Sequence, residues 1–479
     1  MDQKMAYSFC DEFALANTKE QAMRTKSSPQ GYLDFTAASS SKIVLTYRQK
    51  YAAISQVLEA NPKLLGRVHG DLLRALSLSE CGRRSGYTSE QVLRALVVMF
   101  VEGDSYRDVV IRVANSEFLQ SFVKLGPGSM MGFSFLCKAY CAISPKTWQA
   151  MNRALGQYAR REELISSEKV RVDTTAVETN IHYPTDSSLL WDSFRTLARL
   201  MKSVQPQMRC QGMRHRFHVK KVKKLAHYIG RNAGKRSKRE QRRVKKVYGA
   251  LIERVRWINA IALQASTILQ HHTETLDAAA KLAHYAPIVT RIIDQAQRRI
   301  FEGEIVPADE KIYSLFEEHT ELIKRGKAGK PVEFGHKVLF AETEEKFILH
   351  YNAYPRQRAD KDLIHETLTA HRKLFGHAPG LLAADKGFYE SMKQLTALEK
   401  KIPTVAIAKK GRRSSEEFAR EHTDDFVDGQ RFRAGCEGTI SVLKRAFKLH
   451  RCQFKGFKNY AASIGCAVFC HNLVLLARC

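Results

Sequence analysis

Three carboxylates in this chain of 479 residues stand where a metal-dependent nuclease needs acids. Asp173 follows the β-type run Lys169–Val172, and Asp385 follows the β-type run Gly380–Ala384. Glu437 begins a segment with helical periodicity. Two acids on strands and a third on a helix can hold two divalent cations about 4 Å apart, and such a pair of ions positions both the attacking and the leaving oxygen of a phosphodiester displacement. The sequence therefore predicts two-metal-ion chemistry on a phosphodiester.

The spacing around the third acid predicts that one helix presents it together with two cations. Arg433, Glu437 and Lys444 are separated by four and then seven residues. At about 100° per residue they lie within roughly 40° of each other on one helix face. The apolar residues beside this stripe, which can bury the helix against a sheet, are Ile440, Leu443 and Phe447. The guanidinium of Arg433 and the ammonium of Lys444 beside the acid could bind phosphate oxygens. An ordinary basic amphipathic helix has the same spacing, so the interpretation depends on the two aspartates.

With these motifs the sequence resembles the DDE transposases of bacterial insertion sequences, from about Val170 to the C-terminus. The third-acid signature of that family is Tyr, two residues, Arg, three residues, Glu, six residues, Lys. In this chain it is matched at Arg433, Glu437 and Lys444. Gln430 stands at the tyrosine position. Residues Val177–Leu190 resemble the segment after the family's first aspartate, and the letters A-D-K-G-F-Y around Asp385 resemble its second-aspartate motif.

The resemblance implies that Asp173, Asp385 and Glu437 are both the catalytic and the metal-binding residues. Asp173 would bridge two Mg²⁺ or Mn²⁺ ions, and the other two acids would each complete one ion. The implied partners are double-stranded DNA, at the ends of a mobile element and at its target, and a second copy of the chain bound to paired ends. Two further acids, Glu178 and Asp186, are interpreted as scaffold residues.

The implied fold class is α/β, a ribonuclease-H-like mixed sheet with flanking helices, plus an all-α N-terminal domain and a long helical insertion. The predicted domains are an N-terminal segment 1–70, partly flexible; a helical DNA-binding domain 71–160; a catalytic domain 165–182 and 330–479; and a basic insertion 183–329. The catalytic part should form a five-stranded sheet with a hairpin. Its expected elements are strands Val332–Ala341, Lys346–Asn352 and Thr404–Ala408, helices Asp360–Phe375, Tyr389–Lys400 and Tyr460–Arg478, and a mobile loop Lys409–Gly429.

The segment 71–160 carries the signals of a helix-turn-helix. Thr88 and Gln91 form a capping-box pattern before an apolar helical run. Glu102–Asp104 predicts a tight turn, after which Ser105 can cap a helix Tyr106–Ala114. Two short helices joined by a glycine-containing turn are typical of DNA-binding helix-turn-helix motifs, and also of purely structural helical hairpins.

The insertion contains a run of basic residues with hardly any acid. Glu240 is the only acid from Arg214 to Lys246, and the next helical pattern is expected at Val255–Ile300. Like charges one helical turn apart repel each other, so a solvated helix face rarely leaves so many uncompensated. We therefore predict contacts with DNA phosphates, which position a duplex without reading its sequence. The predicted DNA-binding residues are Arg433 and Lys444 beside the acid, and Lys220, Lys221, Lys223, Lys224, Arg242 and Arg243 in the insertion.

Composition agrees with a polyanionic partner. The formal net charge is +29, and such an excess favours nucleic acid through counterion release. The sequence has no run of 18 apolar residues and begins without the pattern of a secretion signal, which favours a cytoplasmic, nucleoid-associated bacterial protein without membrane contact. No C-x-x-C occurs, so the cysteines are interpreted as core residues.

Two other functions stay open at this point. One is another ribonuclease-H-like nuclease, although a long basic insertion and a helix-turn-helix are not needed for it. The other is a non-catalytic DNA-binding protein, such as a domesticated transposase, which would have no need for all three acids. Metal-dependent nicking separates the enzyme from the binder, and joining of the cut ends to a second DNA separates a transposase from a nuclease.

Overall fold

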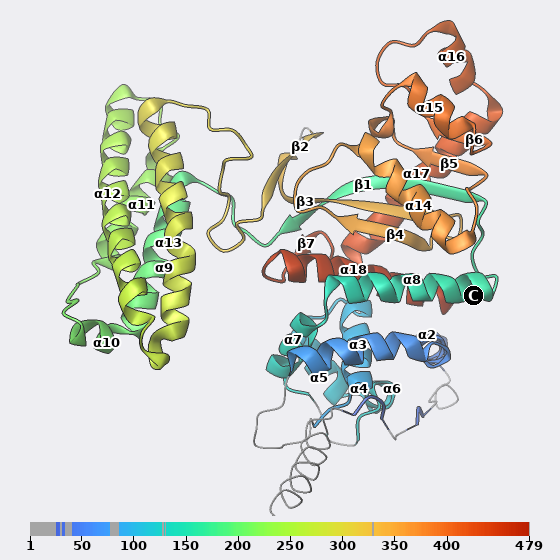
Figure 1. Ribbon diagram of the computed structural model, residues 1–479, viewed down its shortest axis with the longest axis horizontal. Helices are drawn as coiled ribbons and strands as arrows, with labels where there is room; N and C mark the ends of the chain where they lie inside the picture. Colours follow the sequence, from blue (N-terminus) through green and yellow to red (C-terminus); the bar gives the residue numbers. More distant parts are fainter. Residues whose placement is uncertain are drawn as a thin grey trace, which may run out of the picture. The chain divides into compact units, whose positions relative to one another are not determined.

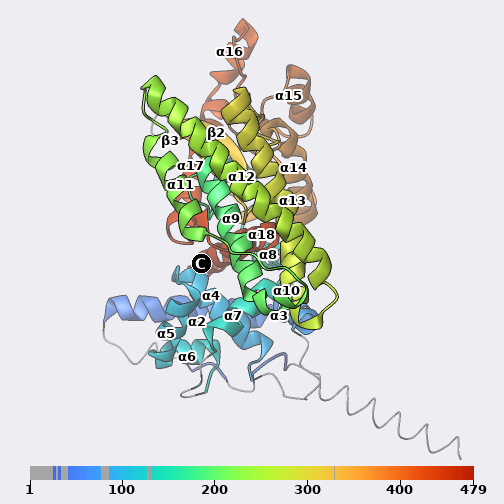
Figure 2. The ribbon, with the colours of Figure 1, turned by 90° about the vertical axis from the view of Figure 1, so that its left-hand side faces the viewer.

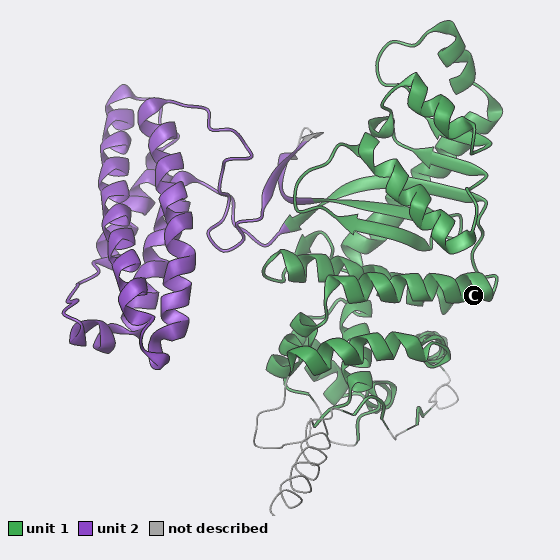
Figure 3. Ribbon diagram, in the orientation of Figure 1, with its two compact units in different colours: residues 1–178, 337–479 green, residues 179–336 purple. Residues whose placement is uncertain are grey.

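A computed structural model describes residues 25–28, 31–33, 41–76, 86–126, 129, 131–327 and 330–478. The chain forms two compact units, Met1–Glu178 with Lys337–Cys479, and Thr179–His336 (Figure 3). The first unit therefore contains all three acids, and the second contains the basic insertion. The finer division of the N-terminal 160 residues into domains stays a prediction. Most of the first 40 residues of the predicted segment 1–70 lie outside the described part.

The strands form a mixed sheet of seven, not five (Figure 1). Their order is β2-β3-β1-β5-β6, with β4 pairing β3 and β7 pairing β1. β5 is parallel to both β1 and β6, whereas β3 pairs antiparallel with β2 and β4. The bounds are β1 (Lys169–Thr179), β2 (Glu321–Lys327), β3 (Lys330–Thr343), β4 (Ile348–Ala353), β5 (Leu381–Ala384), β6 (Thr404–Ile407) and β7 (Arg451–Cys452). The predicted hairpin is confirmed as β3 and β4, and the α/β fold class holds.

Three expectations about the catalytic elements were wrong. Strand β1 does not end before Asp173 but continues to Thr179, because β7 pairs with its second half. Helix α17 (Asp424–Arg445) does not begin at Glu437 but thirteen residues earlier. The expected mobile loop Lys409–Gly429 instead contains helix α16 (Ser415–Glu421) and the start of α17. Its polar composition reflects caps and ion pairs, since Glu417 pairs with Lys409 and closes a capping box with Ser414.

The other helices of the C-terminal part lie close to where the sequence predicts them. They are η4 (Asp360–Leu363) running into α14 (Ile364–Phe375), η5 (Lys386–Phe388), α15 (Met392–Glu399) and α18 (Phe457–Leu476). Helix α18 runs beside α8 (Pro145–Arg161) along the sheet (Figure 1). Among the described helices, α18 alone has the length and hydropathy of a membrane span, but 78% of its most apolar window is buried inside the protein.

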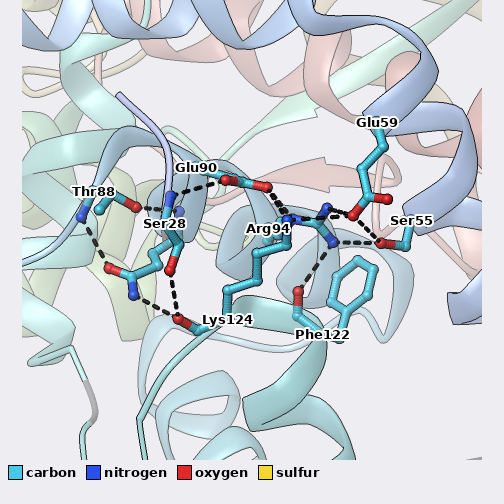
Figure 4. A network of polar contacts seen from close by, with 9 residues as sticks. Ser28, Ser55, Glu59, Thr88, Glu90, Arg94, Phe122 and Lys124 are labelled. Atoms are coloured by element: carbon cyan, nitrogen blue, oxygen red, sulfur yellow. Dashed lines mark hydrogen bonds and ion pairs between the residues drawn. The ribbon is translucent and has the colours of Figure 1, made fainter. Parts of the chain in front are cut away.

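The N-terminal part of the first unit is helical. Its helices are α2 (Lys42–Ala60), α3 (Pro62–Ala75), α4 (Ser89–Val101), α5 (Tyr106–Ala114), α6 (Glu117–Val123) and α7 (Phe133–Ala142). A buried polar network ties them together around Arg94, which is 1% exposed (Figure 4). Its guanidinium bonds Glu90 at 3.0 Å and Glu59 at 2.9 Å, and Lys124 pairs with the same two acids. This network holds α2, α4 and α6 to one another.

The predicted helix pair at 88–114 is confirmed as secondary structure. Thr88 forms the capping box with Gln91, and Ser105 forms one with Asp108. The turn needs Gly103, which has φ +65°. A side chain there would meet Lys448 Cε at 2.8 Å and the carbonyl of Ala446 at 3.0 Å, so the turn packs against the segment that follows α17. Whether α5 binds DNA stays a prediction.

The second unit is built on a bundle of long helices (Figure 2). Its helices are α9 (Asp186–Ser203), α10 (Gln205–Cys210), α11 (Val219–Asn232), α12 (Lys238–Leu269), η2 (Thr273–Thr275), α13 (Leu276–Gln297) and η3 (Arg298–Glu302). The expectation that a second helical pattern begins at Val255 was wrong, because α12 continues through that position to Leu269 and pairs with α13. Residues of α12 such as Leu251 and Val255 are buried on one continuous apolar face.

Candidate active site

The first two acids are brought together by parallel pairing of β1 and β5. In the register of these strands, Val172 lies opposite Ala384. Asp173 and Asp385 are the next residues, so they lie at the same edge of the pairing. Each carboxylate is oriented by the backbone N–H of the following residue, which donates to Asp173 Oδ1 at 2.7 Å and to Asp385 Oδ1 at 2.8 Å. The chain thus places two half-buried carboxylates side by side on adjacent strands.

Helix α17 brings the third acid to this pair. Arg433 Nη1 lies 3.9 Å from Asp173 Oδ2, and Arg433 Nη2 lies 3.3 Å from Glu437 Oε1. Arg433 therefore bridges the strand acid and the helix acid. The side chain of Glu437 is 68% exposed, whereas that of Asp173 is 17% exposed. Lys444 lies half-buried two turns further along α17, on the predicted stripe.

The two other carboxylates act electrostatically on Asp173. Its pKa is raised to about 6, mainly by burial and in smaller part by the charges of Asp385 and Glu437, whereas the N–H of Thr174 and the guanidinium of Arg433 lower it. A cation bound beside such a buried carboxylate would stabilise its ionised form and lower its pKa.

The donor set fits magnesium, although its side chains are not gathered around one point. Carboxylate oxygens are the ligands that Mg²⁺ and Mn²⁺ prefer. No group of three or more His, Cys, Asp or Glu side chains in the described ranges has the geometry of a formed metal site. The reason lies in the two residues on α17, because Glu437 is turned toward Arg433 and into solvent.

A fourth acid, which no sequence motif indicates, lies beside the site. Asp360 Oδ1 accepts hydrogen bonds from Thr174 Oγ1 at 3.0 Å and from Lys337 Nζ at 2.9 Å. Its other oxygen lies 3.1 Å from the point where a Cβ of Gly387 would be. Asp360 thus fits between the residue after Asp173 and the turn after Asp385. Only the tertiary structure could reveal this, because Asp360 opens an unremarkable helix far from both motifs.

The six basic residues of the insertion that are predicted to bind DNA lie in the second unit and face solvent. Lys220, Lys221, Lys223 and Lys224 are exposed on α11, and Arg242 and Arg243 are exposed on α12. The buried face of α11 consists of Val222, Ala226 and Ile229. Within residues 214–246, all of which are described, none of the basic side chains forms an ion pair with an acid. Their charge is therefore not neutralised by ion pairs within the chain.

The two remaining acids near the first motif have structural partners. Glu178 accepts hydrogen bonds from the guanidinium of Arg451, with a contact at 3.0 Å. In the second unit, Asp186 pairs with Arg299 at 2.6 Å. These ion pairs agree with the interpretation of both acids as scaffold residues.

Comparison with known proteins identifies the C-terminal part of the chain. Residues 300–473 match the family described as Transposase DDE domain. The matched segment includes Asp385 and Glu437, and Asp173 lies upstream of it. No curated protein and no solved structure gave a significant match. The chain therefore carries a DDE transposase domain.

Proposed function

We propose that the protein is the transposase of a bacterial insertion sequence, which binds the terminal inverted repeats of its element, cuts at the ends and joins them to target DNA. The observation that carries this proposal is the parallel pairing of β1 with β5, which sets Asp173 beside Asp385, with Glu437 close enough to raise the pKa of Asp173. The family match supports transposition in general, and the acids supply the chemistry that transposition needs.

Two Mg²⁺ or Mn²⁺ ions held by Asp173, Asp385 and Glu437 would activate the attacking oxygen and stabilise the leaving oxygen of the phosphodiester. The chain's own contribution is to hold these acids in place. With a pKa of about 6, Asp173 is mostly ionised at pH 7.5 even before a cation binds. The N–H groups of Thr174 and Lys386 fix one oxygen of each aspartate, which leaves the other oxygen directed away from the backbone.

Arg433 and Lys444 are proposed to hold DNA phosphates next to the acids. In the free protein Arg433 partly neutralises Asp173 and Glu437. The planar guanidinium of Arg433 could instead make two hydrogen bonds with a DNA phosphate beside these acids. Lys444 would add a point charge on the same face of α17.

The basic face of α11 and α12 is proposed to hold the DNA backbone. One shallow hollow of about 540 Å³ lies along α11. It is lined by Lys220, Lys223, Lys224, His227 and Arg231, together with Tyr228 and Asn232. These residues recur at helical spacing, so they form one continuous positive stripe. A positive stripe without acids contacts phosphates independently of base sequence. The assembly we propose on paired ends is a dimer.

The decisive experiment uses a duplex that carries the DNA flanking this open reading frame. Wild-type protein with Mg²⁺ should nick the duplex at the element ends and join the 3′ ends to a second DNA. Asp173→Asn should bind the same duplex with nearly unchanged affinity but should not nick it, because the change removes metal charge and not DNA contacts. Nicking without joining would favour another ribonuclease-H-like nuclease, and binding without nicking by the wild type would favour a domesticated DNA-binding protein.

A further inference from the structure

Helix α17 is attached to the sheet by polar contacts that lie immediately next to the three acids. The first comes from Gln430, whose amide Nε2 donates to the carbonyl of Ala384 at 3.3 Å and to the carbonyl of Ala406 at 2.6 Å. Ala384 directly precedes Asp385, and Ala406 lies on the neighbouring strand β6. One side chain on the helix therefore bonds to the ends of two parallel strands.

Gln430 also shares a helix face with the third acid. Glu437 follows it by seven residues, which is two turns, or about 10 Å along the axis. The two side chains point in directions only about 20° apart. Fixing Gln430 on the strand ends therefore fixes both the rotation of α17 and the height of Glu437 above the sheet.

A second attachment comes from the strand that carries the first acid. Arg171 stands two residues before Asp173 on β1 and is 4% exposed. Its Nη1 donates to the carbonyl of Phe432 at 2.9 Å, and its guanidinium stacks on the Phe432 ring at 4.7 Å. The guanidinium is held from the other side by Glu342, which is fully buried.

Two glycines allow the helix to come this close. A Cβ at Gly435 would collide with the guanidinium of Arg171, and a Cβ at Gly429 would collide with the Cβ of Ala406. Gly435 lies two residues before Glu437, as Arg171 lies two residues before Asp173. The close approach of α17 is therefore built around the same residues that make the polar contacts.

We propose that Gln430 and Arg171 are positioning residues for the metal-binding acids. Together they form a two-point clamp that fixes Glu437 relative to Asp173 and Asp385. Gln430 occupies the position at which the family that this chain resembles has a tyrosine. In this chain the side chain at that position contacts the sheet. The inference rests on the proposed metal site, and it adds residues that do not touch the ions themselves.

The test measures Mn²⁺ affinity by calorimetric titration of the full-length protein at pH 7.5, without DNA. Gln430→Met keeps the length of the side chain but removes both hydrogen bonds. The double variant Arg171→Met with Glu342→Leu replaces the buried ion pair by apolar side chains, an exchange that commonly leaves stability unchanged or improved. Arg431→Met is the matched control, because Arg431 is exposed on the same helix and pairs only with the exposed Asp428.

Both clamp variants should bind Mn²⁺ about 10- to 100-fold more weakly than wild type, the effect typical of losing a group that orients a metal ligand. The control should bind like the wild type, and the unfolding midpoint of each variant, measured in parallel, should show that it is folded. Unchanged Mn²⁺ affinity in both folded clamp variants would overturn the clamp while leaving the metal site intact. If the wild type itself binds no Mn²⁺, the proposed metal site fails, and the clamp fails with it.

Discussion

Replacing Asp173 by Asn should stabilise the metal-free protein while abolishing its chemistry. The Asp173 side chain is only 17% exposed, and the charges of Asp385 and Glu437 are close enough to raise its pKa. An asparagine has nearly the same shape, and its carbonyl oxygen can still accept the N–H of Thr174, which now donates to Asp173 Oδ1 at 2.7 Å. The substitution therefore removes an unfavourable charge and few contacts.

The size of the effect follows from the pKa of Asp173, which is raised from 3.8 to about 6 in the folded protein. Each unit corresponds to about 1.4 kcal/mol, so ionised Asp173 costs about 3 kcal/mol of folding free energy at pH 7.5. The folded state binds the proton more tightly than the unfolded chain. Stability is therefore lost as pH rises between these two pKa values, and at pH 4.5 the penalty is only about 1 kcal/mol.

The assay is urea unfolding in EDTA at pH 7.5 and at pH 4.5. Of the three tryptophans in the chain, Trp148 lies buried in the first unit, so changing Trp191 and Trp257 to Phe makes fluorescence report that unit alone. Asp173→Asn should be more stable than the wild type by about 3 kcal/mol at pH 7.5 and by about 1 kcal/mol at pH 4.5. Asp428→Asn, on the exposed side of α17, should change stability by less than about 1 kcal/mol at either pH.

Replacing the EDTA by Mg²⁺ should change the stability of the wild type in the opposite direction. The ion binds the folded state, so it should stabilise the wild type in proportion to the logarithm of its concentration, and it should have little effect on Asp173→Asn. A variant that is no more stable at pH 7.5, or whose gain is the same at both pH values, would refute the argument that Asp173 carries a costly buried charge.

Three more predictions concern DNA binding, DNA positioning and stability. Changing Lys220, Lys221, Lys223 and Lys224 to Gln should weaken binding to all duplexes alike and lower the slope of log affinity against log salt by about 3 to 4, measured by fluorescence anisotropy; a loss limited to one sequence would mean that these residues read bases. Arg433→Lys should reduce strand joining more than Lys444→Arg, because a two-pronged phosphate contact is lost, and near-normal joining by Arg433→Ala and Lys444→Ala would show that the stripe only solvates the helix. Arg94→Met should destabilise the first unit by about 3 kcal/mol in urea unfolding, because it leaves the buried carboxylate of Glu90 with Lys124 as its only cation, whereas Arg74→Met at the surface should cost about 1 kcal/mol or less.

The sequence was sufficient to find the elements that carry the chemistry. Hydrophobic alternation indicated β3 and β4, and short continuous apolar runs indicated β5 and β6, because one or both faces of each strand are buried. Capping boxes located the starts of α4 and α5, because those hydrogen bonds form between residues three apart in the chain. The acids could be named because each stands at a recognisable place in a local pattern.

Local patterns failed where a distant segment supplies the partner. The continuation of β1 past Asp173 depends on β7, which lies more than 270 residues further along the chain, as the contact of Glu178 with Arg451 shows. The charged segment 409–429 has the composition of a loop, but its helices are held by ion pairs such as Arg420 with Glu399, whose partner lies outside the segment.

The residue types and their spacing were thus enough to propose the kind of chemistry, since carboxylates in such patterns are readable from the chain alone. Their relative placement was decided only by the tertiary structure. Parallel pairing aligns Asp173 with Asp385, and Gln430 and Arg171 join α17 to strands from three separate parts of the sequence. Such contacts leave no periodic signal, because a single buried hydrogen bond between distant residues changes neither the composition nor the hydrophobic period of the segments that it connects.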